Sequence, residues 1–167
     1  MAGMFIGEHT FKVDGKGRVS IPADFRHELT EGDPQAAASG RPRMVIVYGH
    51  ETQKQLIVYT YSGFRALAEE IRALPRGAKR RVIMERMILN LARTTELDND
   101  GRFVLPQPLR DKIKLESTAY FAGMGETFEI WKPETFEDET AQFAEDWIAE
   151  MGPGANPLSL LDEPEGN

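Results

Sequence analysis

The sequence contains no cysteine, so disulfide bridges and thiol chemistry are excluded. It also lacks an apolar run of the roughly 18 to 20 residues that a membrane-spanning helix needs. Residues 1–7 carry neither the basic segment nor the long apolar stretch of a secretory signal. We therefore expect a cytoplasmic protein with no membrane partner, whose 41% hydrophobic residues suffice for a buried core.

Signatures of catalysis and of metal binding are missing as well. The three histidines, His9, His27 and His50, have neither cysteines nor an i, i+4 histidine partner to complete a set of metal ligands. The sequence has no Gly-x-Ser-x-Gly elbow, phosphate loop or dinucleotide-binding glycine motif. We expect the histidines at the surface or at sheet edges, and we predict no enzymatic activity, metal, cofactor or small-molecule substrate.

Basic residues are absent from residues 134–167, which contain ten Asp and Glu residues. The net charge of the chain is −7, yet residues 1–133 hold 20 Lys and Arg against 17 Asp and Glu, a balance of +3. The acidity therefore belongs to the C-terminal segment and does not argue against an anionic partner for the rest of the chain. We interpret that segment as a solvated helix face followed by a tail.

What the sequence does contain is an internal repeat. Residues 14–26 align without a gap on residues 98–110, and both copies read Asp-x-x-Gly-Arg-x-x-x-Pro-x-x-x-Arg. Further along, Tyr59 aligns with Trp131 and Phe64 with Phe136. The offset falls from 84 to 72 between these anchors, which makes residues 31–43, rich in Gly, Pro and Ala, an insertion in the first copy. We predict a surface loop there.

Each copy predicts the same order of elements, and the fold class is α+β. In the first copy we expect strands at 5–11, 18–21, 44–48 and 56–60, a helix from Pro22 to Leu29, and a closing helix with Ser62 as its cap. In the second copy we expect strands at 93–97, 102–105, 118–122 and 128–131, a helix from Pro106 to Ile113, and a closing helix over 133–151.

These elements predict four segments: a first module at 1–77, a connecting helix at 78–91, a second module at 92–150 and an acidic, disordered tail at 151–167. The connecting helix has apolar side chains around more of its surface than one core face requires, which indicates a buried or subunit-facing helix. In the last helix Phe136, Phe143 and Trp147 form one stripe, which we interpret as core packing.

The arginine inside the repeated motif is suited to binding an anion. Alternation along a strand buries Val19 and exposes Arg18, while Gly17 and Asp14 can hold the preceding turn stiff. A guanidinium offers a fixed fork of donors that matches phosphate oxygens or the O6 and N7 atoms of guanine. The alternative is a structural turn whose arginine pairs with Asp14 or Asp24.

Two other groups of basic residues are less specific. Arg26 and Arg110 end the two motifs, where a phosphate contact and a structural bond to Asp14 and Asp98 are both open. A basic group at the join between the copies could widen a phosphate-facing surface, although a solvated linker face is the favoured interpretation. Its members are Arg72, Arg76, Lys79, Arg80, Arg81 and Arg86.

The doubled motif, together with Met4-Phe5-x-Gly7, resembles the MraZ family over about residues 4–150. The resemblance implies two tandem AbrB-like (swapped-hairpin) modules with flanking helices, related by a pseudo-two-fold axis. It implies a sequence-specific DNA-binding repressor of the division and cell-wall gene cluster. Such a protein assembles into a ring-shaped homo-oligomer, binds direct repeats in its own promoter region and is associated with the nucleoid.

By the same resemblance, contacts to double-stranded DNA fall on Lys16, Arg18 and Arg102, to which we add Arg26 and Arg110 as candidates. The second copy has Asp100 where the first has Lys16, so it should be the weaker reader of DNA. Two other functions stay open: an AbrB-like or antitoxin-like regulator of other genes, and an oligomeric scaffold without DNA readout.

Overall fold

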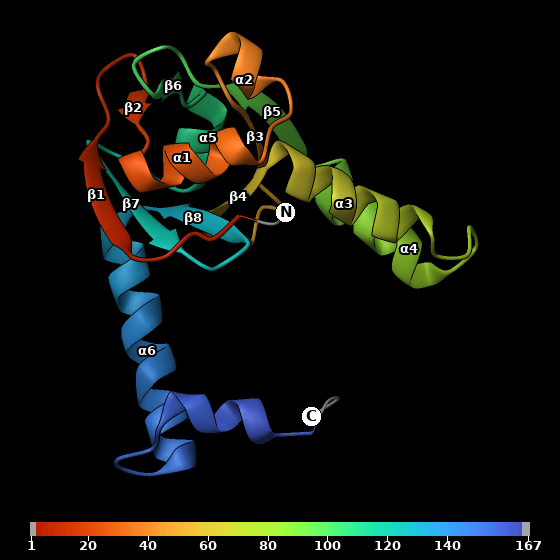
Figure 1. Ribbon diagram of the computed structural model, residues 1–167. Helices are drawn as coiled ribbons and strands as arrows, with labels where there is room; N and C mark the ends of the chain where they lie inside the picture. The colour runs from red at the N-terminus through yellow and green to blue at the C-terminus, as the bar shows by residue number, and fades with distance from the viewer. Residues whose placement is uncertain (1–2, 165–167) are drawn as a thin grey trace. The chain divides into compact units, whose positions relative to one another are not determined.

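The computed structural model describes residues 3–164. The chain forms two compact units, the first ending at Pro133 and the second beginning at Glu134. Residues 1–2 of the predicted first module and residues 165–167 of the predicted tail lie outside the described residues. In the first unit, the strands form a sheet and α1 lies across one of its faces (Figure 1).

Apart from α2, the two copies of the repeat have the same order of elements, and their mixture of antiparallel strands and helices confirms the α+β class. The first copy contains β1 (Glu8–Lys12), β2 (Arg18–Ser20), α1 (Ala23–Glu31), α2 (Ala36–Ser39), β3 (Arg43–Val47), β4 (Leu56–Thr60) and α3 (Tyr61–Arg72). The second contains β5 (Ala92–Glu96), β6 (Arg102–Val104), α5 (Gln107–Lys112), β7 (Thr118–Gly123), β8 (Thr127–Trp131) and α6 (Pro133–Met151). Between them lie α4 (Lys79–Met84) and the π-helix η1 (Glu85–Leu89), and after them the 3-10 helix η2 (Pro157–Asp162).

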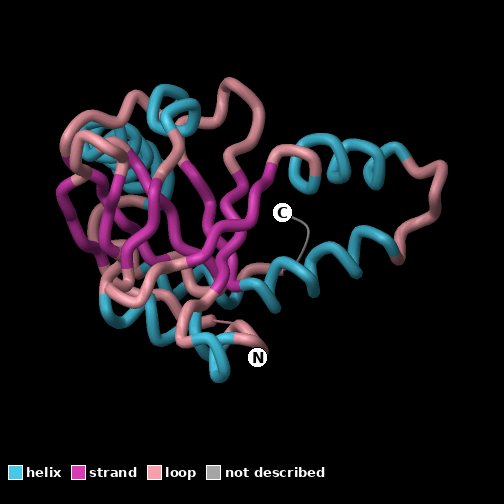
Figure 2. Tube along the Cα trace, turned by 90° about the horizontal axis from the view of Figure 1, so that it is seen from above, coloured by secondary structure: helices cyan, strands magenta, loops and turns pink. Residues whose placement is uncertain are grey.

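Strands from the two copies interlock in one six-stranded antiparallel sheet of order β1-β7-β8-β4-β3-β5. The counterpart strands of the two copies are β1 and β5, β3 and β7, and β4 and β8. They occupy symmetric positions in the sheet, so the order read from one edge for the first copy matches the order read from the other edge for the second. The two short strands β2 and β6 form a separate antiparallel pair, again one from each copy. The strands are seen from above in Figure 2. Each copy therefore completes the sheet of the other.

The core is shared in the same way. Phe25 of the first copy and Phe128 of the second are almost fully buried, and their ring centroids are 4.8 Å apart. Phe5 contacts both rings edge-on, at 5.3 Å and 5.0 Å. Val19 and Phe103, which face each other across β2 and β6, are buried as well. Because aromatic side chains bury large apolar areas, this cluster ties the two copies together.

Two local predictions need correction. The cap of α3 is Thr60, whose hydroxyl accepts a hydrogen bond from the Gly63 amide at 2.9 Å, and not Ser62. Thr60 still has extended backbone angles at the end of β4, as a cap residue requires, whereas Ser62 already lies within the helix. The first predicted strand is also shorter, because residue Phe5 forms only an isolated bridge to Gly125 before β1 begins.

The insertion at 31–43 is more ordered than a surface loop. It contains the short helix α2, and the Asp33 side chain within it is buried. Both carboxylate oxygens of Asp33 accept hydrogen bonds from Arg43, at 2.6 to 2.9 Å, from its guanidinium and its backbone amide. These hydrogen bonds with Arg43 hold the pKa of Asp33 at about 2. The insertion is thus fixed to the start of β3 by an ion pair.

The connecting segment forms a hairpin with α3, and both helices extend away from the sheet (Figures 1 and 2). The segment predicted as one helix consists of α4 followed by the π-helix η1. None of the side chains in α4 or η1 is buried, and four large apolar ones are at least 36% exposed. They are Val82, Ile83, Met84 and Met87. The expectation that this helix is buried within the chain is therefore wrong, and its role in contacting another subunit stays a prediction.

The second unit consists of most of α6 and the helix η2. The structure describes all of α6, and none of its side chains is buried. Phe143 is 73% exposed, so the expected core packing of this residue is wrong. The 3-10 helix η2 lies within the segment for which the sequence predicts disorder. No helix among the described residues is both long and apolar enough to cross a membrane.

Candidate nucleic-acid interface

The two repeated motifs meet on the ribbon formed by β2 and β6. Arg18 lies opposite Val104 and Ser20 lies opposite Arg102, so the two arginines occupy diagonal positions. Val19 and Phe103 alternate with them and point into the core, at 2% and 3% exposure. This alternation, with a period of two, leaves both arginines on the face of the ribbon away from the core. The predicted exposure of Arg18 is confirmed.

The first motif loop (residues 14–18) is held by the carboxylate of Asp14. Its Oδ1 atom accepts hydrogen bonds from the backbone amides of Lys16 and Arg18, both at 2.9 Å. The Asp14 carbonyl accepts a further bond from the Gly17 amide at 3.0 Å. Gly17 has a φ of 83°, a conformation that side chains of L-residues rarely adopt. The turn is therefore rigid, with the Lys16 and Arg18 side chains exposed at its end.

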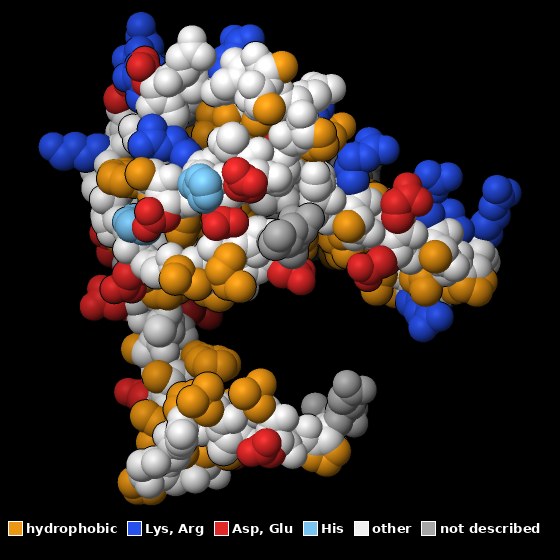
Figure 3. Space-filling view, in the orientation of Figure 1, with side chains coloured by type: hydrophobic (Ala, Val, Ile, Leu, Met, Phe, Trp, Pro, Cys, Tyr) orange, Lys and Arg blue, Asp and Glu red, His pale blue; other side chains and the backbone are white. Residues whose placement is uncertain are grey.

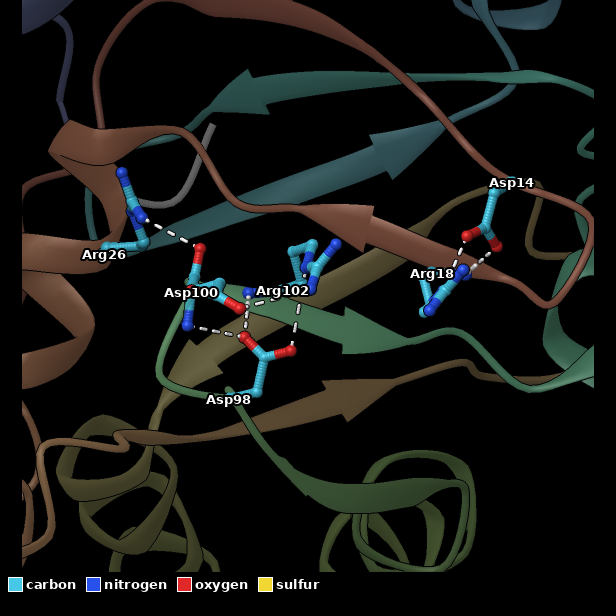
Figure 4. Close-up of polar contacts among 6 residues, drawn as sticks. All are labelled: Asp14, Arg18, Arg26, Asp98, Asp100 and Arg102. Atoms are coloured by element: carbon cyan, nitrogen blue, oxygen red, sulfur yellow. Dashed lines mark hydrogen bonds and ion pairs between the residues drawn. The ribbon is translucent and has the colours of Figure 1, made fainter.

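The second motif loop (residues 98–102) repeats this geometry. Oδ1 of Asp98 accepts from the amides of Asp100 and Arg102, both at 2.9 Å, and Gly101 has a φ of 74°. One difference follows from the sequence, because Asp100 replaces the lysine of the first loop. Its Oδ2 atom lies 3.2 Å from Nη2 of Arg102, and Oδ2 of Asp98 lies 3.7 Å from Nε (Figure 4). Arg102 therefore contacts two carboxylates.

The first loop leaves its arginine freer. Arg18 Nε lies 2.6 Å from Oδ2 of Asp14, and the two side chains are 46% and 41% exposed (Figure 4). The pairing with Asp14 is the structural alternative that the sequence left open. An exposed pair of this kind contributes little to stability, and the remaining donors of the guanidinium can bind another anion. The ion pair with Asp14 therefore orients the Arg18 side chain and leaves some of its N–H donors available for another anion.

The aspartates of both loops are ionised at neutral pH. Hydrogen bonds from the backbone and side chain of Arg18 lower the pKa of Asp14 to about 2. The pKa of Asp98 is also lowered, chiefly by the backbone amide of Arg102. A deprotonated carboxylate can only accept hydrogen bonds, which matches its role in binding the amides of each turn. The loops therefore keep their shape across the physiological pH range.

Arg26 and Arg110 lie elsewhere than the sequence led us to expect. Arg26 donates to the backbone carbonyl of Asp100 at 3.3 Å, and Arg110 donates to that of Leu105 at 2.9 Å. Both side chains are half-buried. These bonds go to backbone carbonyls and differ from the anticipated structural bonds to Asp14 and Asp98. A DNA contact by either arginine stays a prediction.

Two basic residues near the ribbon were not identified from the sequence. Open depressions of about 380 and 220 Å³ both have Arg18 and Arg102 in their lining. Lys12 borders the first and Arg41 the second, where Arg41 pairs with Glu96 at 3.1 Å. Arg41 belongs to the insertion and has no counterpart in the repeat, so no sequence signal pointed to it. Lys12 precedes the motif, and only the folded ribbon brings it near Arg18.

The basic group at the join between the copies lies on the hairpin of α3 and α4. Figure 3 shows Lys and Arg side chains along these helices, separate from those at the end of the unit that carries β2 and β6. Arg81 is mostly covered and donates to the carbonyls of Arg72 and Leu74. Arg72 pairs with Glu69. These contacts agree with the interpretation of the group as a helix surface.

The histidines contribute no metal site among the residues that the structure describes, where no cluster of three His, Asp or Glu side chains is found. His27 and His50 are exposed, and His9 lies in the edge strand β1, as expected. The described part of the chain thus offers the paired motif loops as its main concentration of functional side chains.

Comparison with known proteins agrees with this arrangement. The family model described as "MraZ protein, putative antitoxin-like" matches residues 4–86 and 88–150, two successive segments that fit the tandem repeat. Proteins named "Transcriptional regulator MraZ" from Ruegeria pomeroyi and Cereibacter sphaeroides are 44% and 42% identical, over 100% and 98% of both chains. One of that name from Saccharophagus degradans is 34% identical, over 80% of this chain and 85% of its own. This is a family of regulators, which confirms the prediction that the chain is not an enzyme. The chain belongs to the MraZ family.

Proposed function

We propose that this protein is a sequence-specific DNA-binding transcriptional regulator that reads duplex DNA with the two motif loops. One observation carries the proposal: the β2–β6 ribbon presents Arg18 and Arg102 together, each on a turn held by an ionised aspartate. A two-stranded ribbon fits the major groove of B-DNA, where arginine is the commonest partner of guanine. The relatives named transcriptional regulators support this assignment.

The two loops would contribute unequally. Lys16 and Arg18 add two positive charges at the first loop, whereas Asp100 offsets the charge of Arg102 at the second. A carboxylate near a phosphate is repelled and reduces the attraction of the neighbouring guanidinium. Lys16 and Arg18 are therefore the principal DNA-binding residues, and Arg102 is the secondary one. Lys12 and Arg41 lie where they would extend the positive surface.

The fold proposed for this function is the AbrB-like, swapped-hairpin arrangement. It is supported by the pairing of β1 with β7, of β3 with β5 and of β2 with β6, which exchanges strands between the copies. The pseudo-two-fold relation brings the motif loops of both copies to the same ribbon. A DNA-reading surface of this kind needs both copies of the repeat.

The biological role that we propose is repression of the division and cell-wall gene cluster through direct repeats in the protein's own promoter region. A ring-shaped homo-oligomer would present several equivalent ribbons, so that individually weak contacts add through effective concentration. The exposed apolar side chains of α4 and η1 support self-association, because such patches mark interaction surfaces. The protein would act in the cytoplasm at the nucleoid, without a cofactor.

The proposal is tested by Arg18→Ala, with Arg76→Ala as a control that removes the same charge from the turn between α3 and α4. Fluorescence anisotropy of a labelled duplex from upstream of the protein's own gene measures the affinity. We expect Arg18→Ala to abolish specific binding with the oligomer intact, and Arg76→Ala to bind as the parent does. Parental affinity in Arg18→Ala would refute the assignment, and a chain that binds no DNA at any salt concentration would be a scaffold instead.

A further inference from the structure

The glycine directly before the arginine of each motif loop is buried although its loop is at the surface. Gly17 and Gly101 are both buried, whereas Lys16 and Asp100 beside them are exposed. The side chain that covers each glycine comes from the opposite copy of the repeat. Arg110 of the second copy lies over Gly17 of the first, and Arg26 of the first copy lies over Gly101 of the second.

The contacts between these arginines and glycines are close. A Cβ atom added to Gly17 would lie 2.6 Å from the Leu105 carbonyl oxygen and 2.9 Å from both Cζ and Nε of Arg110. The three atoms nearest to one added to Gly101 would all belong to Arg26, with Cζ at 2.9 Å and Nη1 and Cδ closer. Separations below 3.0 Å are essentially never observed for real Cβ atoms. The positive φ favours glycine in both loops, and the absence of a side chain lets the arginine of the opposite copy approach the backbone closely.

Hydrogen bonds connect the same segments crosswise. The Leu105 amide donates to the Gly17 carbonyl at 2.8 Å, and the Leu105 carbonyl accepts from Nε of Arg110. In the other direction, the Ile21 amide donates to the Gly101 carbonyl at 3.0 Å, and Arg26 donates to the adjacent carbonyl of Asp100. The backbone bonds thus occur twice with the copies exchanged, whereas the arginines differ: Arg26 donates to the opposite loop itself, and Arg110 donates to Leu105 of its own copy, the residue whose amide donates to the opposite loop.

We propose that Arg110 and Arg26 are positioning residues, each of which holds the motif loop of the opposite copy in its DNA-reading conformation. Arg110 positions the loop that carries Lys16 and Arg18, and Arg26 positions the loop that carries Arg102. This inference rests on the proposed function for its effect on DNA, but its structural part stands independently of it. A guanidinium suits the task because it is planar and carries several N–H donors, so it can lie close to a backbone that has no side chain and still donate to a carbonyl.

The positioning of each loop by the opposite copy has a consequence for DNA affinity that a direct DNA contact does not share. If the first loop is the stronger reader, Arg110 matters more for DNA affinity than Arg26, although Arg110 belongs to the weaker copy. A positioning residue also lies off the phosphates, so removing it lowers affinity without changing the number of counterions released on binding. Loss of one phosphate contact would instead reduce the slope of log K against log salt by about 0.9.

The test uses the full chain with Arg110→Ala, Arg26→Ala and their lysine counterparts, and begins with hydrogen exchange of the protein without DNA. Arg110→Ala should accelerate amide exchange in residues 14–18 and leave residues 98–102 unchanged, and Arg26→Ala should do the reverse. If either alanine variant fails to fold, the lysine variant replaces it, because lysine can donate to the same carbonyl but cannot cover the glycine. The proposal would be overturned if a variant showed the parental rate of amide exchange in the motif loop of the opposite copy.

DNA affinity, measured by anisotropy on the upstream duplex over a salt series, gives the second readout. We expect Arg110→Ala to lower affinity about ten-fold with the parental salt slope, and Arg26→Ala to lower it less. A slope reduced by about 0.9 would show a direct phosphate contact and overturn the positioning role. The Arg18→Ala variant separates the two proposals: if it binds normally, the proposed function fails, while the exchange results still decide whether the arginines hold the loops.

Discussion

At the scale of single residues, Gly15 and Gly17 lie two positions apart in one loop but have different surroundings. Gly17 has a positive φ and lies beneath Arg110, whereas a Cβ on Gly15 would meet no atom within 4 Å. We expect Gly17→Ala to lower the free energy of unfolding by about 2 kcal/mol through backbone strain and a clash with the Leu105 carbonyl and the Arg110 side chain. Gly15→Ala should change it by less than about 0.5 kcal/mol. Urea denaturation measures both, and equal stabilities would contradict the strained backbone and close packing at Gly17.

A second residue-scale prediction concerns the position that differs between the loops. Replacing Asp100 with lysine, as at Lys16, should release Arg102 and strengthen binding to the upstream duplex. Lys16→Asp should weaken it, because a negative charge then lies beside Arg18. We expect the slope of log K against log salt to rise by about 0.9 in Asp100→Lys and to fall by about 0.9 in Lys16→Asp. Anisotropy over a salt series provides the measurement, and slopes that match the parent in both variants would contradict unequal loops.

At the scale of elements, the ion pair between Asp33 and Arg43 fixes the insertion to β3. The pKa of Asp33 lies near 2 in the folded protein, below its ordinary value of 3.8, because the folded state binds the carboxylate with Arg43. The stabilisation is therefore complete above about pH 4 and is lost as the pH falls from 4 towards 2. We expect Asp33→Asn to cost about 2 kcal/mol at pH 7 and to flatten the acid limb of the stability curve.

The matched control for this prediction is Glu31→Gln, which neutralises an exposed carboxylate in the same segment. It should leave both the stability at pH 7 and its acid dependence close to those of the parent. Thermal unfolding followed from pH 2 to pH 7 distinguishes the two variants. An Asp33→Asn protein with the parental pH dependence would show that the pair does not stabilise the folded chain.

The elements themselves could be predicted well from the sequence, because they depend on local signals. The alternation around Val19 and the prolines Pro22 and Pro106 place β2, α1 and α5 to within two residues. The burial of Asp33 could not be foreseen, since its partner Arg43 is ten positions away and the segment between them reads as a loop. The contacts of Arg26 and Arg110 were inaccessible for the same reason, because they depend on which copy each helix lies against.

At the scale of the whole molecule, the chain up to Pro133 forms one compact unit with an interlocked sheet, which we expect to unfold cooperatively. We expect Phe25→Ala in the first copy and Phe128→Ala in the second each to lower the free energy of unfolding by about 3 to 5 kcal/mol. Both substitutions should lower the midpoint temperature of one and the same thermal transition. Differential scanning calorimetry measures this. Two separate transitions, one shifted by each substitution, would show that the copies fold independently.

The central claim is that the paired loops of the β2–β6 ribbon bind DNA through Arg18 and Arg102. Its most direct test is the salt dependence of binding to the upstream duplex, compared between the parent and the double variant Arg18→Ala, Arg102→Ala. If both arginines contact phosphate, the slope of log K against log salt should fall by about 1.8 and specific binding should disappear. A double variant with the affinity and slope of the parent would contradict the account.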